Sequence, residues 1–270
     1  GKHCHLNGFR DNHSTFDGSQ TTFPKLMQQA GYQTAILGKW HLVSQPTGFD
    51  HWEILPGQGQ YYNPTLLSAP KEPGGEPTKR RVVGYCTDIV TDLALEWLDT
   101  RRDASKPFVL MLQHKAPHRE WQPGPEELGL FRGRTFPEPP TLFDDYAGRA
   151  GGAAEQEMTI ARHMTARDLA LKAPENLTPE QKARWDAAFA AENAAFAAAP
   201  PTGADRVRWN YQRYIANYLR CVAGVDRTIG RVLEHLDKKG LARDTIVIYS
   251  SDQGFYLGEH GWYDKRWMYE

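Results

Sequence analysis

Three stretches of the chain each read as a short apolar strand followed at once by charged or imidazole side chains. They are QTAILGKWHL (33–42), PFVLMLQHKAPH (107–118) and DTIVIYSSDQG (244–254). In an open α/β sheet the carboxyl ends of the strands share one edge, where ligands bind. We therefore expect the polar residues that end these stretches to gather in space: Lys39, His41, Lys115, His118, Asp252 and Gln253. Such a cluster suits an anionic substrate and an oxygen-liganded metal.

Helical patterns alternate with these strands, as a doubly wound sheet requires. A short helix is predicted over 21–30 and a longer one over about 87–101. The clearest periodicity lies at about 205–239, where apolar residues recur at spacings of one, three and four, as on one buried helix face. This helix leads into the third predicted strand, at 245–250.

Two parts of the chain are predicted to be irregular. Residues 44–85 are rich in Gly, Pro and Tyr, and loops of that length in compact domains are often functional. Residues 120–203 are the least regular, although Thr178-Pro179-Glu180-Gln181 has the capping-box pattern ahead of a surface helix. No repeat or linker divides the chain. Residues 1–270 are therefore predicted to be part of one α/β domain, with a mostly parallel central sheet flanked by helices.

The bulk properties exclude several classes of protein. A chain of 270 residues can bury a large core as one domain. Its net charge of −1 argues against a general basic surface for nucleic acid. No apolar run approaches the ~20 residues that cross a bilayer. The three cysteines (Cys4, Cys86 and Cys221) lie far apart and have no zinc-site spacing.

Four motifs carry a resemblance to a known family. GYQTAILGKWH resembles the second signature of the formylglycine-dependent sulfatases, which belong to the alkaline phosphatase superfamily. APH at 116–118, SDQG at 251–254 and the lysine in YDKRWMYE are also similar to motifs of that family. They occur in the family's order, and the resemblance runs essentially from end to end. It implies an alkaline phosphatase-like fold and the hydrolysis of sulfate esters.

The resemblance also implies roles for four side chains. Lys39 would contact the sulfate and the nucleophile, and His41 would hold the hydrated formylglycine. His118 would bind sulfate or protonate the leaving oxygen, and Lys265 would bind a sulfate oxygen from the far side. The chemistry agrees, because lysines stabilise the charge that develops on a cleaved sulfate ester and a nearby histidine can act as general acid.

The same resemblance implies a metal site. Asp252 and Gln253 would ligate a divalent metal, with Ca²⁺ expected. Carboxylate and amide oxygens suit such a hard cation rather than zinc or copper. Gln253 stands where many family members have Asn, and both residues offer an amide oxygen, although glutamine has the longer reach.

Other family features are missing from the chain. Family members carry the cysteine that becomes formylglycine in a C-x-P-S-R segment, and the opening Gly-Lys-His resembles the end of that stretch. We expect the nucleophile and two metal-binding aspartates upstream, since Cys4 lacks the required Pro and Arg. The chain is therefore interpreted as a fragment, incomplete at both ends and inactive by itself.

Several nearby residues have less definite roles. Lys115 adjoins the APH motif and is predicted to face sugar or sulfate. His114 and the pair Tyr61-Tyr62 either line the substrate pocket or belong to the packing. His260 is given no role.

The substrate class follows from resemblance alone. QHKAPHR and GEHGWYDKRWMYE are most similar to glycosaminoglycan- and mucin-directed members, particularly those acting on 6-sulfated N-acetylglucosamine. The expected partner is thus a sulfated saccharide, with no nucleic acid and no membrane span. A secreted or periplasmic location would suit such a protein, although no residue here establishes it. Two alternatives stay open: a phosphate- or phosphonate-ester hydrolase of the same superfamily, and a noncatalytic pseudoenzyme that binds sulfated glycans.

Overall fold

The computed structural model describes residues 2–72 and 74–267, and the chain falls into two compact units. Unit 1 comprises Gly1–Ala116 together with Val225–Arg243, and unit 2 comprises Pro117–Gly224 together with Asp244–Glu270. Helix α6 (Gly203–Lys238) begins in unit 2 and ends in unit 1. That the whole chain forms part of one catalytic domain stays a prediction.

Unit 1 is built on a five-stranded mixed sheet. Its strands are β1 (Gln33–Trp40), β2 (His51–Pro56), β3 (Thr65–Ser68), β4 (Thr78–Arg81) and β5 (Phe108–Gln113). The spatial order is β4-β3-β2-β1-β5. The three strands β2, β1 and β5 run parallel, whereas β3 and β4 pair antiparallel. The parallel part therefore has a single carboxyl edge, as the sequence predicts.

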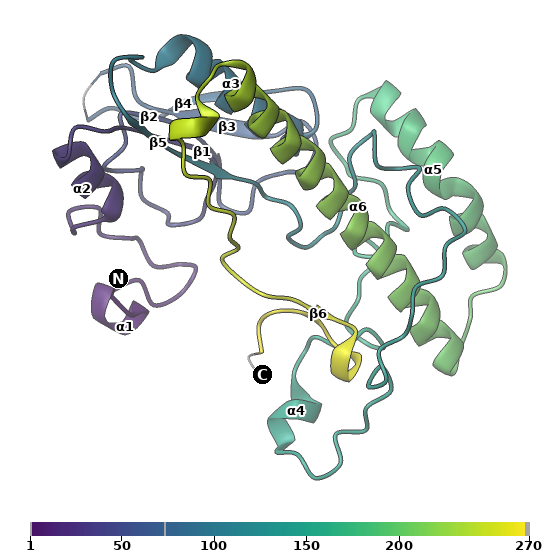
Figure 1. The fold of residues 1–270 in the computed structure, drawn as a ribbon. Coiled ribbons are helices and arrows are strands. Elements are labelled where there is room, and N and C mark those ends of the chain that lie inside the picture. The colour runs from purple at the N-terminus through teal and green to yellow at the C-terminus, as the bar shows by residue number, and fades with distance from the viewer. Residues whose placement is uncertain (1, 73, 268–270) are drawn as a thin grey trace. The chain divides into compact units, whose positions relative to one another are not determined.

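Both faces of β1 are buried, which explains its continuous apolar run. Ala35 and Leu37 pack against α3 (Cys86–Glu96) and the end of α6, whereas Ile36 packs with Trp52 on the opposite face. Figure 1 shows the strands together with α2 and α3 beside them. A sheet covered by helices confirms the predicted α/β class.

Most of the predicted helices and strands in unit 1 are confirmed. The expected helix at 21–30 is α2 (Phe23–Gln29), with Thr22 at its N-cap. The helix at 87–101 is α3 with a final π-helical turn (Trp97–Arg101). A short helix, α1 (Cys4–Asn7), lies near the N-terminal end.

The irregular excursion predicted for 44–85 is wrong, because β2, β3 and β4 all lie in it. The sequence of β4, TKRR, has no apolar alternation. It becomes a strand by pairing with β3, and such pairing depends on neighbours more than on local propensity.

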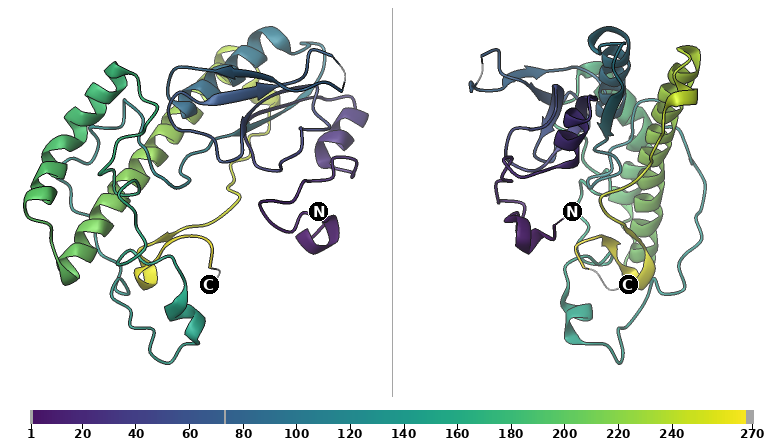
Figure 2. Two further views of the ribbon diagram at one scale, coloured as in Figure 1. Left: turned by 180° about the vertical axis from the view of Figure 1, so that it is seen from behind. Right: turned by 60° about the vertical axis from the view of Figure 1, so that its left-hand side comes forward.

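Unit 2 holds α4 (Gly151–Glu155), α5 (Pro179–Ala198) and the first part of α6. The capping box is confirmed: the Thr178 N–H donates to Gln181 at 2.8 Å and the Gln181 N–H donates to Thr178 at 3.3 Å. Figure 2 shows α5 alongside α6. Phe196 and Trp209 join the two helices, with ring centroids 4.3 Å apart.

The predicted strand at 245–250 is wrong in this structure. The segment forms no strand, and Ile246 and Ile248 are 90 % and 84 % exposed. A strand exists only with a hydrogen-bonding neighbour. Within residues 2–72 and 74–267, the ladders are the sheet of unit 1 and the hairpin of β6 (Tyr256–Leu257) with β7 (Tyr263–Asp264). No strand of the described residues therefore pairs with this segment, and SDQG follows an irregular stretch.

None of the helices in the described part of the chain has the length and apolar character needed to cross a membrane.

Candidate active site

The carboxyl edge of unit 1 brings together the ends of the first two predicted strands. In the parallel pair of β1 and β5, Gly38 lies opposite Gln113. Lys39, which is still within β1 and pairs with Leu55 of β2, and His114, which follows the last residue of β5, therefore lie at the same edge. Gly38 allows this approach, because a Cβ there would stand 2.0 Å from the Gln113 carbonyl oxygen.

His41 follows the end of β1 and lies near Lys39 and His13. Burial, together with the positive charges of Lys39 and His13, lowers the pKa of His41. The neutral imidazole is therefore favoured at neutral pH, and a neutral ring can accept a hydrogen bond as well as donate one.

Lys115 is held by contacts inside unit 1. Its side chain is buried, with the residue 7 % exposed. Its ammonium donates to the Gln58 carbonyl at 2.9 Å and lies 4.8 Å from the centroid of the Tyr61 ring. These contacts give both Lys115 and Tyr61 a packing role. A contact of Lys115 with substrate stays a prediction.

His114 is an unusual feature of the same edge. Both ring nitrogens are buried, and neither has a hydrogen-bond partner within residues 2–72 and 74–267. Burial lowers the pKa of His114 to about 4, although the Asp88 carboxylate acts in the opposite direction. A buried imidazole without a partner is costly. Both roles predicted for His114, in the substrate pocket or in the packing, stay predictions.

His118 is the second residue of unit 2 and has a defined tautomer. Its Nδ1 lies 2.5 Å from the carbonyl oxygen of Arg119. A carbonyl oxygen can only accept, so Nδ1 must carry the proton. Nε2 is then the nitrogen whose protonation changes the charge of the ring.

An aromatic cluster gathers three motif segments within unit 2. The Trp121 ring packs edge-on against both Phe255 and Tyr263, with centroids 6.0 Å away in each case. The Lys265 ammonium lies 5.3 Å from the centroid of the Phe255 ring. The segments that follow APH, follow SDQG and precede Lys265 therefore converge, although the first is more than a hundred positions from the other two in sequence.

The pKa of Lys265 depends on its burial and on charged residues of these segments. Burial lowers the pKa of Lys265, the charge of Asp252 opposes this change, and the charge of Arg119 adds to it. The last three residues of its motif, 268–270, lie outside the described residues.

Asp252 and Gln253 provide only part of a metal site. Both side chains are exposed, and the Gln253 carbonyl accepts a hydrogen bond from the Ser251 hydroxyl at 2.8 Å. Nowhere in residues 2–72 and 74–267 do three or more His, Cys, Asp or Glu side chains form a group that could hold a metal. The two oxygen donors fit a hard cation, but such a cation takes about six ligands or more.

The seven predicted site residues are divided between the units. Lys39, His41 and Lys115 belong to unit 1. Unit 2 holds the remaining four: His118, Asp252, Gln253 and Lys265.

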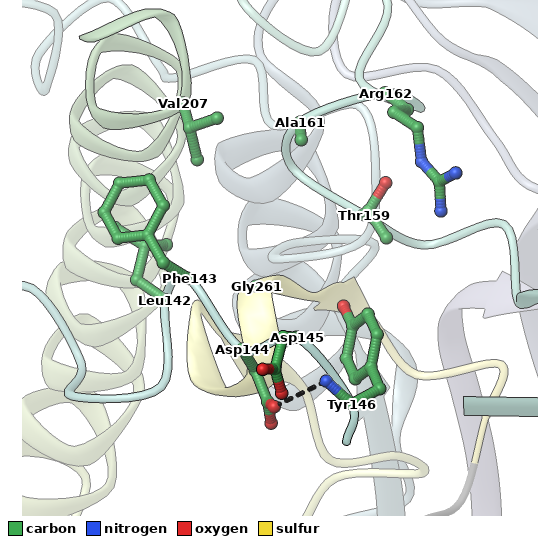
Figure 3. Close-up of a pocket in the computed structure, with 10 residues that line it drawn as sticks. All are labelled: Leu142, Phe143, Asp144, Asp145, Tyr146, Thr159, Ala161, Arg162, Val207 and Gly261. Atoms are coloured by element: carbon green, nitrogen blue, oxygen red, sulfur yellow. Dashed lines mark hydrogen bonds between the residues drawn. The ribbon is translucent and has the colours of Figure 1, made fainter. Parts of the chain in front are cut away.

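The polar side chains that line a hollow in unit 2 are engaged with neighbouring residues. Figure 3 shows Asp144, Tyr146 and Thr159 among its lining residues. The Asp144 carboxylate is already engaged by the Tyr146 N–H at 2.9 Å and by Nδ1 of His260 at 2.7 Å. The Thr159 hydroxyl is engaged by His163. His260, to which the sequence gave no role, thus joins two loops.

Comparison with known proteins agrees with the motifs. A family model described as sulfatase matches residues 4–269. The chain is 48 % identical over 289 residues to the N-acetylglucosamine-6-O-sulfatase of Bacteroides thetaiotaomicron, covering 100 % of this chain and 50 % of that protein. It is 25 % identical over 262 residues to the N-acetylglucosamine-6-sulfatase of Capra hircus, covering 92 % of this chain and 38 % of that protein. The chain thus spans half or less of these curated relatives.

Solved structures show the same fold. One, described as a complex with its substrate D-glucosamine-2-N,6-O-disulfate, has a TM-score of 0.93 at 47 % identity and covers 100 % of this chain and 57 % of its own. The phosphonate monoester hydrolase of Silicibacter pomeroyi has a TM-score of 0.55 at 16 % identity, covering 96 % and 52 %, so that likeness concerns the fold alone. The family model, the identity along the whole chain and the fold together place this chain in the sulfatase family.

Proposed function

We propose that the protein containing this chain hydrolyses sulfate esters of glycans, with 6-sulfated N-acetylglucosamine as the preferred unit. The observation that carries the proposal is the convergence of the segments bearing His118, Asp252 and Lys265 in unit 2, in a chain of the sulfatase family. The substrate is supported by a relative named N-acetylglucosamine-6-O-sulfatase and by a solved structure in complex with a glucosamine disulfate.

Each side chain then has a chemical task. A sulfate monoester carries dispersed negative charge, so the ammonium groups of Lys39 and Lys265 bind its oxygens and oppose the charge that develops during cleavage. The neutral ring of His41 accepts a hydrogen bond from the nucleophile. Lys115 acts on the sugar or sulfate if its ammonium can leave the Gln58 carbonyl.

His118 is the general acid in this proposal. The leaving group from a sugar is an alkoxide, which is a strong base and must be protonated as the S–O bond breaks. Because Nδ1 is held by a carbonyl oxygen, the proton is delivered from Nε2.

Sulfatases generally use a formylglycine nucleophile and a divalent metal. We place the formylglycine upstream of Gly1, and assign Asp252 and Gln253 as two of the oxygen ligands of Ca²⁺. When bound, the cation would neutralise charge on the sulfate.

The test uses the full-length protein, produced in a host that converts cysteine to formylglycine. Sulfate release is measured from N-acetylglucosamine 6-sulfate and from an aryl sulfate. For comparison, release of the alcohol is measured from a phosphonate monoester. We expect release from the saccharide, and loss of that activity in His118→Gln and Lys265→Met. Release from aryl sulfate but from no sulfated saccharide would overturn the glycan assignment. Turnover of the phosphonate alone would favour the phosphonate-ester hydrolase. Saccharide binding without turnover would favour the noncatalytic pseudoenzyme.

A further inference from the structure

Beside His118 lies an ion pair that no motif indicated. Nε and Nη2 of Arg119 donate to the two carboxylate oxygens of Asp168, each at 2.6 Å. This is a two-point arrangement that fixes both the distance and the orientation of the guanidinium. The partners are 49 positions apart in sequence, so the pair ties the APH segment to a distant loop of unit 2.

The Asp168 end of the pair is rigid. Its carboxylate is 0 % exposed and also accepts the N–H and hydroxyl of Thr165, at 2.7 and 2.8 Å. Four donors thus converge on one buried carboxylate. A buried charge is retained without a large penalty only when it is paired and hydrogen-bonded in this way.

The Arg119 end touches two candidate catalytic segments. Its carbonyl oxygen holds Nδ1 of His118 at 2.5 Å. Its guanidinium carbon lies 5.1 Å from the centroid of the Tyr263 ring, two residues before Lys265. Tyr263 is itself anchored, because its hydroxyl donates to the His163 carbonyl at 2.9 Å.

We propose that Arg119 and Asp168 are positioning residues, which fix the tautomer and direction of His118 and its spacing from Lys265. This inference rests on the proposed function for its effect on catalysis, although its structural part does not. Arg119 acts on His118 through its own main-chain carbonyl, and on Lys265 through the ring of Tyr263. A displacement of about 1 Å in such a constellation costs about 100-fold in rate.

The general-acid role of His118 makes the effect dependent on the leaving group. A nitrophenolate leaves without protonation, whereas a sugar alkoxide does not. A misdirected His118 therefore slows sugar sulfate hydrolysis more than aryl sulfate hydrolysis. A merely structural pair would affect both substrates alike, through the amount of folded enzyme.

The experiment compares Asp168→Asn and Arg119→Lys with wild type in the full-length protein. We expect kcat on N-acetylglucosamine 6-sulfate to fall about 10- to 100-fold with KM little changed, and kcat on nitrophenyl sulfate to fall much less. The matched control is Glu53→Gln in unit 1, which also removes a buried carboxylate paired with an arginine, at 2.6 Å from Arg80. It should lower stability and leave the ratio of the two kcat values unchanged.

A second variant separates positioning from folding. Arg119→Met with Asp168→Leu removes both charges at similar volume, which commonly preserves or improves stability. If the double variant is as stable as wild type but its ratio of kcat on sugar sulfate to kcat on aryl sulfate stays low, the proposal is supported. If both the stability and this ratio return to the wild-type values, the proposal is overturned.

A readout without substrate keeps the inference separate from the proposed function. ¹⁵N spectra of the wild-type imidazoles should show His118 protonated at Nδ1, and a mixture of tautomers in Asp168→Asn. An unchanged His118 signal in that variant, together with an unchanged kcat ratio, would overturn the positioning role. A wild-type protein that releases no sulfate but shows the tautomer shift would refute the proposed function alone.

Discussion

Gly38 and Gln113 approach each other across β1 and β5 so closely that a Cβ on Gly38 would stand 2.0 Å from the Gln113 carbonyl oxygen. Gly38 also has a φ of +109°, which L side chains rarely adopt. Both its small size and its positive φ therefore require glycine here, next to Lys39 near the carboxyl end of β1.

Gly38→Ala should consequently destabilise the protein by about 3 kcal/mol or more, through overpacking and backbone strain. Denaturant unfolding measures the change. Gly31→Ala is the matched control, because Gly31 has a φ of +88° and a Cβ added there would meet no atom within 4 Å; it should lose only about 1–2 kcal/mol. Equal losses in the two variants would contradict the close approach.

His114 should stay neutral far below the usual range of histidine. Its folded pKa of about 4 lies below the ordinary value of 6.5, so the unfolded chain takes up a proton first as pH falls. Its contribution to stability is present above about pH 6.5 and is lost between there and about pH 4. An NMR titration should show its midpoint near 4 in the folded protein and near 6.5 in urea. A folded midpoint at the ordinary value would mean that the ring is solvated.

Asp144 predicts a second pH effect, at lower pH. The hydrogen bond from His260, with further donors from Tyr146 and Arg149, lowers the pKa of Asp144 from 3.8 to about 2. Since the folded pKa is the lower one, the contribution is present above about pH 4 and is lost as pH falls towards 2. Stability measured against pH should fall less steeply for Asp144→Asn than for wild type in this window. Parallel curves would contradict the prediction.

Lys115→Met distinguishes packing from substrate binding. The variant keeps the apolar stem but leaves the Gln58 carbonyl without its donor, and should cost about 1–3 kcal/mol of stability. A packing role leaves KM for the sulfated sugar unchanged, whereas the predicted substrate contact raises it. Unfolding curves and steady-state kinetics on the same preparation separate the two roles.

Local patterns were sufficient where a segment's structure depends on its own residues. The capping box at Thr178 and Gln181 is present with both of its hydrogen bonds, because its partners are three positions apart. The strand at β5 has the predicted bounds, 108–113. Its apolar run is long enough to identify it without knowledge of its neighbours.

Sequence patterns gave wrong predictions where strand pairing decides whether a segment becomes a strand. Strand β4 is polar throughout and exists through β3, whereas the apolar segment at 245–250 has strand character and forms none. Backbone hydrogen bonds between strands are made by partners distant in sequence, so composition alone cannot say which segments obtain one.

The sequence by itself determined the family and the α/β class, because these follow from short ordered motifs and hydrophobic periodicity. The chemistry of Lys39, His41, His118, Asp252, Gln253 and Lys265 stays a prediction from the same motifs. The tertiary structure decided the surroundings of individual side chains: the burial of His114 without a hydrogen-bond partner among residues 2–72 and 74–267, the Nδ1 proton of His118, and the anchoring of Arg119 by Asp168. These depend on burial and on contacts between segments far apart along the chain, and no local pattern encodes which distant carboxylate meets which guanidinium.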